Sequence, residues 1–299
     1  MSFTLVINSK NSFGANNNTY KYDFIQGNFI IPPDSEVMIA NVQIPYSFYN
    51  ITQSYNNNSF QFSFPTGSET FVTSTITIPD GFYTTTSLNY YLQQYMIANG
   101  YYLVNNAGQN VYYYTIQYNS YQYGNQLLGY LVPTSLPSGY SYPAGYTSST
   151  IFGGNGFPTI SRTPYLTILE NSFGTFLGYT AGNYPITDNS LTNYSGNSSI
   201  TPVGSTVNSI IVRCSLVDNK VGIPMDILDS FTIGGVGFGN NINYSPNTAK
   251  WVKLSSGSFS NFYITFCDQN LSLLPALDNN IMVTLLFRLG KPKSSLTNE

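Results

Sequence analysis

The sequence predicts an all-β protein, built as a sandwich or a barrel, and three observations support this class. Hydrophobic residues alternate with polar ones over eight short stretches, which are bounded by glycine, proline or asparagine. Aromatic residues make up 16% of the 299 residues and hydrophobic residues 42%, enough to fill a core. A single stretch has the period of a helix instead.

The eight predicted strands follow from period-two alternation, which places every second side chain on the same face. In chain order they cover residues 36–44, 59–64, 69–78, 111–118, 207–217, 250–254, 262–267 and 281–289. The clearest example is the second, where Phe60, Phe62 and Phe64 alternate with polar residues.

One amphipathic helix is predicted over residues 86–98. Its apolar residues recur at helical spacing, at Leu88, Tyr91, Leu92, Tyr95 and Met96. The threonines at 84–86 offer oxygens that cap a first turn, and Asn99-Gly100 supplies a left-handed stop. Because the helix lies between two predicted strands, we expect it to cover an end or a face of the sandwich.

Composition suggests how the chain is organised. We expect an N-terminal arm at 1–22, two halves of one sandwich at 23–118 and 206–290, an insertion at 119–205 and a flexible tail at 291–299. A loop-like stretch as long as the insertion is unusual inside a compact domain and is usually functional. Its tyrosines argue against disorder, because rigid rings among glycine and serine make adaptable contact surfaces.

Charge and residue types exclude several classes of function. Charged residues are 8% of the chain and the net charge is −3, so the ten basic residues cannot coat a nucleic-acid duplex. The chain has no histidine, which rules out imidazole bases, Ser-His-Asp triads and histidine-bearing metal sites. The N-terminal sequence lacks the pattern of a signal peptide, and no stretch approaches the ~18 apolar residues of a membrane span.

The remaining candidates for catalysis are weak. The carboxylate pairs of interest are Asp226/Asp229 and Asp268/Asp278, and nothing in the sequence places either pair across a cleft, as glycosidases need. We interpret Asp268 and Asp278 as turn residues. The glycine-rich run GGVGFG at 234–239 lacks the Lys-Ser/Thr of a phosphate-binding loop and is predicted to be a plain loop. We therefore expect no enzyme, no cofactor and no metal site.

Two other residue types invite interpretations that the sequence does not support. Cys214 and Cys267 belong to no Cys-x-x-Cys pair and lie in strand-like stretches, so buried free thiols are favoured over a disulfide. Asn-x-Ser/Thr triplets occur at Asn17, Asn50 and Asn193. They are expected by chance in a chain so rich in these residues.

Three stretches, taken in order, carry a family resemblance. The first is IPYSFYNIT at 44–52 followed by NNNSFQFSF, and the second is TITIPDGFYTTTSLNYYLQQYM at 75–96. The third, in the C-terminal half, comprises SIIVRCSLVDN, IPMDILDSFTIGGVGFGNNINYSP and FYITFCDQNLSLLPALDNNIMVTLLFRL. Together they resemble the penton, or minor capsid, proteins of virophages and of the related polinton-like and adenovirus-type viruses. The resemblance covers most of the chain except residues 119–205.

The resemblance implies a single eight-stranded jelly roll with an insertion, assembled as a homopentamer. Such a pentamer would fill each five-fold vertex of an icosahedral capsid, among major capsid proteins with a double jelly roll. The protein would be located in the virion, after assembly inside the host cell, in its cytoplasm. Low charge and many aromatic residues agree with this role separately, because neighbouring subunits would bury the flanks.

A carbohydrate- or receptor-binding β-sandwich, such as a spike or lectin-like module, is the alternative from another class. The two roles are compatible, because an outward-facing insertion would be free to bind a host receptor or glycan. Specific nucleic-acid binding is not expected, since a cationic groove is missing from the sequence.

Seven residues are expected to contact partners: Phe3, Phe13, Tyr140, Tyr142, Tyr146, Lys291 and Lys293. The two phenylalanines would anchor an arm that reaches under neighbouring capsomers, so deleting the first twenty residues would spare folding. The three tyrosines would form a contact surface on the insertion. The two lysines are candidates for contact with the genome or an acidic partner, although a solvated tail is the favoured interpretation.

Overall fold

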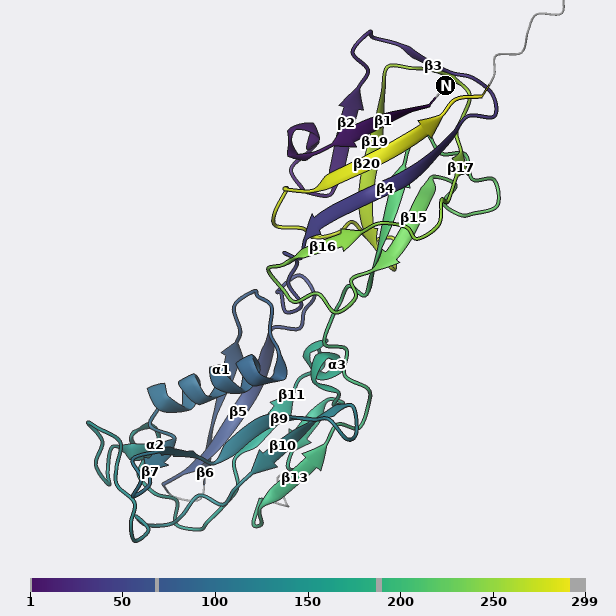
Figure 1. Ribbon diagram of the computed structural model, residues 1–299. Helices are drawn as coiled ribbons and strands as arrows, with labels where there is room; N and C mark the ends of the chain where they lie inside the picture. Colours follow the sequence, from purple (N-terminus) through teal and green to yellow (C-terminus); the bar gives the residue numbers. More distant parts are fainter. Residues whose placement is uncertain (1, 68–69, 187–189, 291–299) are drawn as a thin grey trace, which may run out of the picture. The chain divides into compact units, whose positions relative to one another are not determined.

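A computed structural model describes residues 2–67, 70–186 and 190–290 and confirms the all-β class (Figure 1). Among these residues the strands are numbered β1 to β20, with three short α-helices and one 3-10 turn, η1 (Ser9–Asn11). The chain folds into two compact units. The jelly-roll unit comprises the described residues of 1–48 and 207–299, and the inserted unit comprises those of 49–206.

The jelly-roll unit is named for the order of its eight main strands. These are β1 (Ser2–Ile7), β2 (Thr19–Asp23), β4 (Glu36–Pro45), β14 (Ser209–Cys214), β15 (Ile227–Thr232), β16 (Asn241–Tyr244), β19 (Asn261–Asp268) and β20 (Met282–Arg288). One sheet has the order β1-β20-β4-β16 and the other β15-β14-β19-β2. Counted along the chain, the sheets hold strands 1, 8, 3, 6 and 2, 7, 4, 5, which is jelly-roll connectivity.

Three minor strands complete this unit. β17 (Val252–Lys253) pairs with β4, and β3 (Phe29–Ile31) pairs with β18 (Gly257–Phe259). Because the strands alternate in direction, the connections β2–β4, β14–β15 and β16–β19 share one end of the unit with the start of β1 and the end of β20. We call this end the terminus end. The chain leaves for the inserted unit, and returns from it, at the opposite end.

The core of the jelly-roll unit lies between its two sheets. On β20, Val283, Leu285 and Phe287 are fully buried and alternate with residues on the outer face. The ring of Phe287 stacks on Phe3 of β1, with centroids 4.9 Å apart, and meets Phe262 of the other sheet at 6.2 Å. The last strand therefore joins both sheets to the N-terminal strand.

The inserted unit has its own sheets, in which all the strands are antiparallel. One has the order β12-β11-β5-β6, another β13-β10-β9, and β7 pairs with β8. Their bounds are β5 (Ser59–Thr66), β6 (Thr70–Thr77), β7 (Tyr102–Val104), β8 (Asn110–Tyr112), β9 (Tyr114–Asn119), β10 (Gly124–Gly129), β11 (Tyr165–Ile168), β12 (Gly182–Tyr184) and β13 (Tyr194–Asn197). The helices are α1 (Thr85–Ala98), α2 (Ile151–Gly154) and α3 (Phe173–Leu177).

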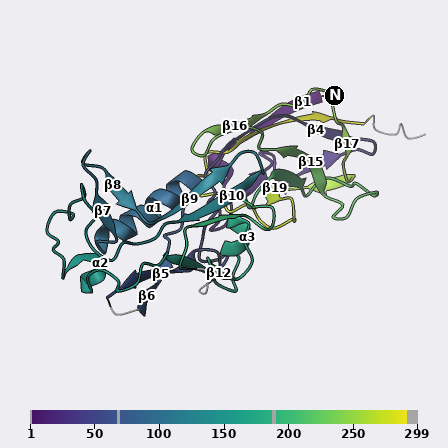
Figure 2. The same cartoon turned by 90° about the horizontal axis from the view of Figure 1, so that it is seen from below.

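Helix α1 confirms the helix predicted at 86–98 and packs against β9 (Figure 2). Thr84 caps its first turn, accepting a hydrogen bond from the Ser87 amide at 3.2 Å. At the other end Gly100 adopts a left-handed φ of +67°, the predicted stop. The apolar face buries Leu88 and Met96, as their spacing predicted.

Aromatic rings fill the core of the inserted unit. Phe60, Phe62 and Phe64 are all buried, which confirms the face predicted from their alternation. Phe64 stacks on Tyr101 with centroids 4.3 Å apart, and Phe60 stacks on Phe173 at 4.9 Å. The alternating strand thus supplies the centre of a second core and does not join the jelly roll.

The predicted domain boundaries are wrong at the N-terminal side of the insertion. The inserted unit begins at residue 49, not 119, so the strands predicted at 59–64, 69–78 and 111–118 lie in it together with the helix. At the C-terminal side it ends at residue 206, one residue from the prediction. Periodicity identifies the buried face of a strand but does not say which core covers that face.

The predicted N-terminal arm is also wrong for the described residues. β1 pairs with β20 along its whole length, and β2 pairs with β19. Phe3, Leu5 and Ile7 alternate with exposed residues, a short period-two pattern that the surrounding polar residues obscure. Deleting the first twenty residues removes the whole of β1, so we expect this deletion to impair folding. The predicted tail at 291–299 lies outside the described residues.

One buried side chain joins the two ends of the inserted unit. Asn50, which is 2% exposed, donates from Nδ2 to the carbonyl oxygens of Tyr83 and Gly204, each at 2.8 Å. Its Oδ1 accepts from the Tyr83 amide, also at 2.8 Å. The burial of this asparagine agrees with the interpretation of its triplet as a chance occurrence.

Replacing Asn50 by alanine is expected to lower the free energy of unfolding by about 2–4 kcal/mol, because three hydrogen bonds made by a buried side chain are lost. Chemical denaturation measures this. The control is Asn110→Ala, which removes one exposed hydrogen bond to Tyr112 and should cost less than about 0.5 kcal/mol. Equal losses in both variants would contradict the role of Asn50.

Replacing Phe3 or Phe13, the two residues predicted to anchor an arm, should lower the free energy of unfolding by different amounts. Phe3→Ala removes a partly buried ring that stacks on the fully buried Phe287, and it is expected to cost about 2–4 kcal/mol. Phe13 is 48% exposed and contacts Tyr263 edge-on, so Phe13→Ala should cost less than about 1 kcal/mol. The same denaturation assay compares them, and a negligible effect of Phe3→Ala would restore the arm.

Candidate interaction surfaces

The carboxylate pair considered for catalysis is held in ion pairs. Asp226 binds the guanidinium of Arg213, with the Nη2–Oδ2 distance at 2.9 Å. Asp229 is buried, accepting from Lys250 Nζ at 2.9 Å and from the Tyr244 hydroxyl at 2.7 Å. Each carboxylate therefore stabilises strands of the jelly-roll unit.

The other acidic and glycine-rich candidates form turns, as predicted. Asp268 Oδ1 accepts hydrogen bonds from the amides of Asn270 and Ser272, at 2.8 and 3.0 Å. Asp278 accepts from the Asn280 amide in the same way, at 2.8 Å. The run at 234–239 is the loop between β15 and β16.

The two cysteines are buried and free, which confirms their interpretation as thiols. Burial raises the pKa of Cys214 to about 12 and also raises that of Cys267. Among the described residues, no three His, Cys, Asp or Glu side chains are grouped so as to hold a metal ion. Nor does any helix in that part of the chain have the length and hydrophobicity to cross a membrane.

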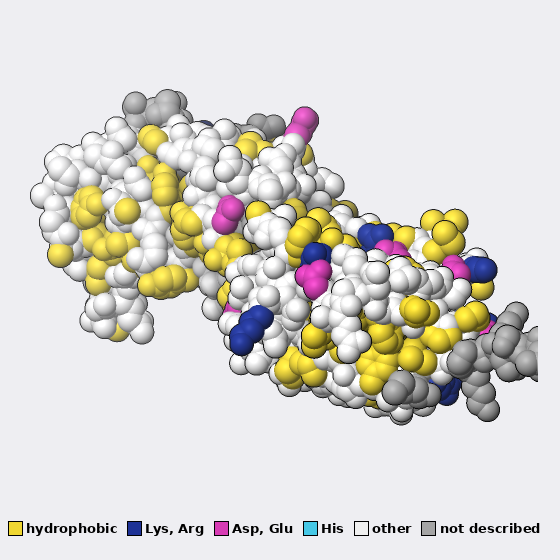
Figure 3. Space-filling view, turned by 90° about the horizontal axis from the view of Figure 1, so that it is seen from above, with side chains coloured by type: hydrophobic (Ala, Val, Ile, Leu, Met, Phe, Trp, Pro, Cys, Tyr) yellow, Lys and Arg dark blue, Asp and Glu magenta, His cyan; other side chains and the backbone are white. Residues whose placement is uncertain are grey.

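Tyrosine and charge are distributed unequally between the two units. Only Tyr20, Tyr22, Tyr46, Tyr244 and Tyr263 lie outside residues 49–206, so the inserted unit holds 22 of the 27 tyrosines. It holds five of the 23 charged residues, with a single basic one. In Figure 3, accordingly, the charged side chains lie mainly on the jelly-roll unit. The inserted unit is therefore sparse in charge, with four acidic residues and one basic residue, and rich in phenol groups.

The three tyrosines predicted to contact partners lie half-buried against the core of the inserted unit. Tyr142 meets the ring of Phe157 at 6.2 Å, and the Tyr146 hydroxyl lies 3.5 Å from the Ala98 carbonyl oxygen. The third, Tyr140, packs on the same core. All three thus have a structural role within the unit, and their contact with partners stays a prediction. Lys291 and Lys293 lie outside the described residues.

Other tyrosines, which the sequence reasoning missed, are far more exposed. Tyr118, Tyr121 and Tyr123 surround the tip of the β9–β10 hairpin and are 54%, 99% and 69% exposed. Two of them line a pocket of about 450 Å³. The available signal was the spacing YNSYQYG, in which the aromatic residues alternate with turn-forming ones.

Five exposed aliphatic side chains lie on two connections at the terminus end of the jelly-roll unit. Ile25 (94% exposed) and Ile30 (71%) belong to the β2–β4 connection, and Val221 (97%), Ile223 (96%) and Met225 (57%) belong to the β14–β15 connection. Side chains of this size are normally at least partly covered, and larger exposed groups of them mark interaction sites. We call these five residues the apolar end patch.

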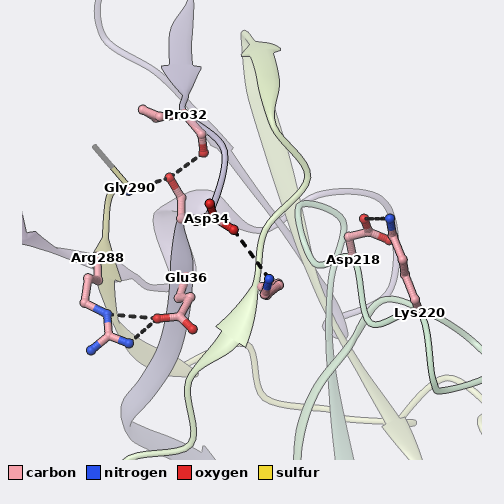
Figure 4. A network of polar contacts seen from close by, with 9 residues as sticks. Pro32, Asp34, Glu36, Asp218, Lys220, Arg288 and Gly290 are labelled. Atoms are coloured by element: carbon pink, nitrogen blue, oxygen red, sulfur yellow. Dashed lines mark hydrogen bonds and ion pairs between the residues drawn. The ribbon is translucent and has the colours of Figure 1, made fainter. Parts of the chain in front are cut away.

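Polar contacts fix the backbone at the same end of the unit (Figure 4). Arg288 pairs with Glu36, and the Arg288 guanidinium also lies over the Trp251 ring at 4.5 Å. Ser35 donates from Oγ to the Pro32 carbonyl oxygen at 2.7 Å and accepts from the Gly290 amide. These contacts hold the start of β4 and the end of β20 together at this end of the unit.

Comparisons with known proteins were made for sequence and for structure. No protein-family profile matches the sequence, and no curated protein matches it. The structure is similar to the mavirus penton protein, with a TM-score of 0.41 at 11% identity, over 97% of this chain and 100% of that one. It is also similar to a chain of the Sputnik virophage structure, with a TM-score of 0.41 at 13% identity, over 97% of each chain.

The buried tyrosines predict how stability depends on pH. Burial raises the pKa of Tyr101 from 10.0 to about 12 and also raises the pKa of Tyr114 well above its usual value. In the unfolded chain these phenols ionise near pH 10, so above that pH the folded state binds more protons. Their contribution is complete below the unfolded pKa and is lost as the pH rises through the folded pKa.

We therefore expect the free energy of unfolding to be steady near about pH 8 and to fall between about pH 10 and pH 12. Urea denaturation across this range measures it. Tyr101→Phe should reduce the fall, whereas Tyr121→Phe, at a fully exposed position, should leave it unchanged. A stability that rises above pH 10 would contradict the assignment.

Proposed function

We propose that this chain is a structural capsid protein that assembles into a homopentamer at the five-fold vertices of an icosahedral virion. The observation that carries the proposal is the apolar end patch, on a jelly roll with a large insertion between its third and fourth strands. The ordered sequence motifs that resemble penton proteins support it independently.

The jelly-roll fold is compatible with more than one function. Jelly rolls serve as capsid domains and as lectins, so the surface has to distinguish these roles. Burying an aliphatic side chain of this size stabilises a complex by about 1.5–3 kcal/mol in the best case. Ile25, Val221 and Ile223, each more than 90% exposed, are therefore suited to a protein contact. A site for sugar alone would not need them.

Ring formation requires a head-to-tail contact between two different faces of the subunit. The edge strands are β1 and β16 in one sheet and β15 and β2 in the other. Neighbours in a ring would cover edge strands of this kind, which otherwise offer unpaired backbone groups. The low charge of the chain agrees with flanks that other subunits cover.

The partners of the pentamer and its location follow from this role. The pentamer would be seated among major capsid proteins with a double jelly roll, in the virion, after assembly in the host cytoplasm. Phe13, half-exposed beside β2, is retained as a contact candidate, as are Lys291 and Lys293 in the tail. No enzymatic step, cofactor or specific nucleic acid is part of this role.

Mass measurement tests the pentamer. Native mass spectrometry of the purified full chain should find a species of about 165 kDa, five times the 33.1 kDa subunit, and electron-microscopic class averages should show five-fold rings. A chain that stays monomeric at high concentration would overturn the pentamer.

A double variant, Val221→Glu with Ile223→Glu, tests the apolar end patch. Both side chains are almost fully exposed, so folding should be unchanged. We expect at least ~100-fold weaker association, either between subunits or with the surrounding capsid proteins in a reconstitution assay, because charges are depleted from interface cores. The control is Ile186→Glu, at a 64% exposed position of the inserted unit. Unchanged pentamers that enter capsids normally would exclude the patch from assembly.

A further inference from the structure

A pocket within the inserted unit has the properties of a ligand site. It is bounded by the first turn of α1, the β9–β10 hairpin and α3. Its volume of about 450 Å³ lies in the range of small-molecule sites, roughly 300–1,000 Å³. Rings of Phe82, Tyr118 and Tyr123 line it together with the hydroxyl side chains of residues 84–86. This combination of aromatic and polar groups suits a ligand that is itself amphipathic.

The backbone conformation of Tyr123 favours a role for its ring in ligand binding. Tyr123 has a φ of +45°, in the left-handed region that costs a bulky residue about 1–2 kcal/mol. Glycine or asparagine would adopt this conformation at lower cost. The tyrosine is also 69% exposed, so its ring contributes little to the core. A strained backbone that presents an aromatic ring to solvent at a pocket is best explained by binding.

The polar floor of the pocket is rigid before any ligand arrives. Asn125 is 4% exposed, accepts a hydrogen bond from Thr85 Oγ1 at 2.7 Å and donates to the Leu177 carbonyl oxygen at 2.9 Å. Having donated its proton, the Thr85 hydroxyl retains lone pairs that accept from a ligand. The amides at 85 and 86 belong to the first turn of α1, where no earlier helical carbonyl can pair with them. Fixed groups of this kind lower the entropic cost of binding.

We propose that this pocket binds a neutral oligosaccharide. A pyranose has one apolar C–H face, which stacks on aromatic rings, and a rim of hydroxyls, which pair with groups like Thr85. Among the described residues that line the pocket none is charged, so a phosphate, sulfate or carboxylate would find no cation. The inserted unit has a single basic residue, Arg162, and it does not line the pocket. Sugar binding here goes beyond the capsid role and does not depend on it.

The full-length protein is tested by titration calorimetry with soluble oligosaccharides ending in glucose, galactose, mannose or N-acetylglucosamine, and with sialylated and sulfated counterparts. At least one neutral probe should bind, and Tyr118→Ala should weaken it by at least ~10-fold, the scale of losing a stacked ring. Tyr123→Gly should do the same while relaxing the backbone, so binding is lost without a loss of stability.

The matched control is Tyr121→Ala, which removes a fully exposed ring from the same hairpin but outside the pocket, and should bind as the parent does. The inference is overturned if no neutral probe binds at millimolar concentration, if only anionic probes bind, or if the control loses as much affinity as the pocket variants. Native mass spectrometry of the same variants distinguishes a loss of sugar binding from a loss of pentamer assembly, because the hairpin substitutions leave the apolar end patch intact.

Discussion

The fold depends on the side chain of Asn50, which connects the two ends of the inserted unit. A jelly roll needs its third and fourth strands to follow one another at the same end, yet about 160 residues separate β4 from β14 here. Closing a flexible loop of that length costs on the order of 4–5 kcal/mol. Because Asn50 is hydrogen-bonded to the Gly204 carbonyl oxygen, a folded inserted unit presents its two ends together. The jelly roll then has a short connection in place of a long one, and its assembly is linked to the stability of the insertion.

The jelly roll adds a second long-range condition. β1 and β4 do not pair with each other; β20, the last strand, lies between them and pairs with both. Phe287 on that strand stacks on Phe3 at the other end of the described chain, so the N-terminal strand and the C-terminal strand stabilise one another. Pairings so distant in sequence form slowly, because the entropy of loop closure is lost before the stabilising contacts are made. The aromatic core of the inserted unit consists of more local contacts, and is thus suited to form first.

The sequence predicted local structure well and the partition between cores poorly, for a physical reason. The helix and the buried face of β5 follow from spacing alone, since each depends on neighbouring residues. Whether Phe62 packs in the jelly roll or in a second core depends on contacts that spacing does not encode. β15 was missed because Asp229 is buried in it, held by Lys250, and interrupts the apolar pattern. The pocket was missed because its residues come from distant segments, which only the fold brings together.

The unequal distribution of charge suits the two units to different kinds of partner. The jelly-roll unit carries nine residues of each sign by sequence, and those at its terminus end form ion pairs beside the apolar end patch. In the proposed assembly, contacts there would combine apolar burial with charges that fix register, and they would respond to salt. The inserted unit carries only four acidic residues and one basic residue, so a neutral ligand would be recognised there by stacking and hydrogen bonds at short range. Such contacts change little with ionic strength, so the proposed binding of a neutral ligand would persist under conditions that weaken the proposed charged contacts.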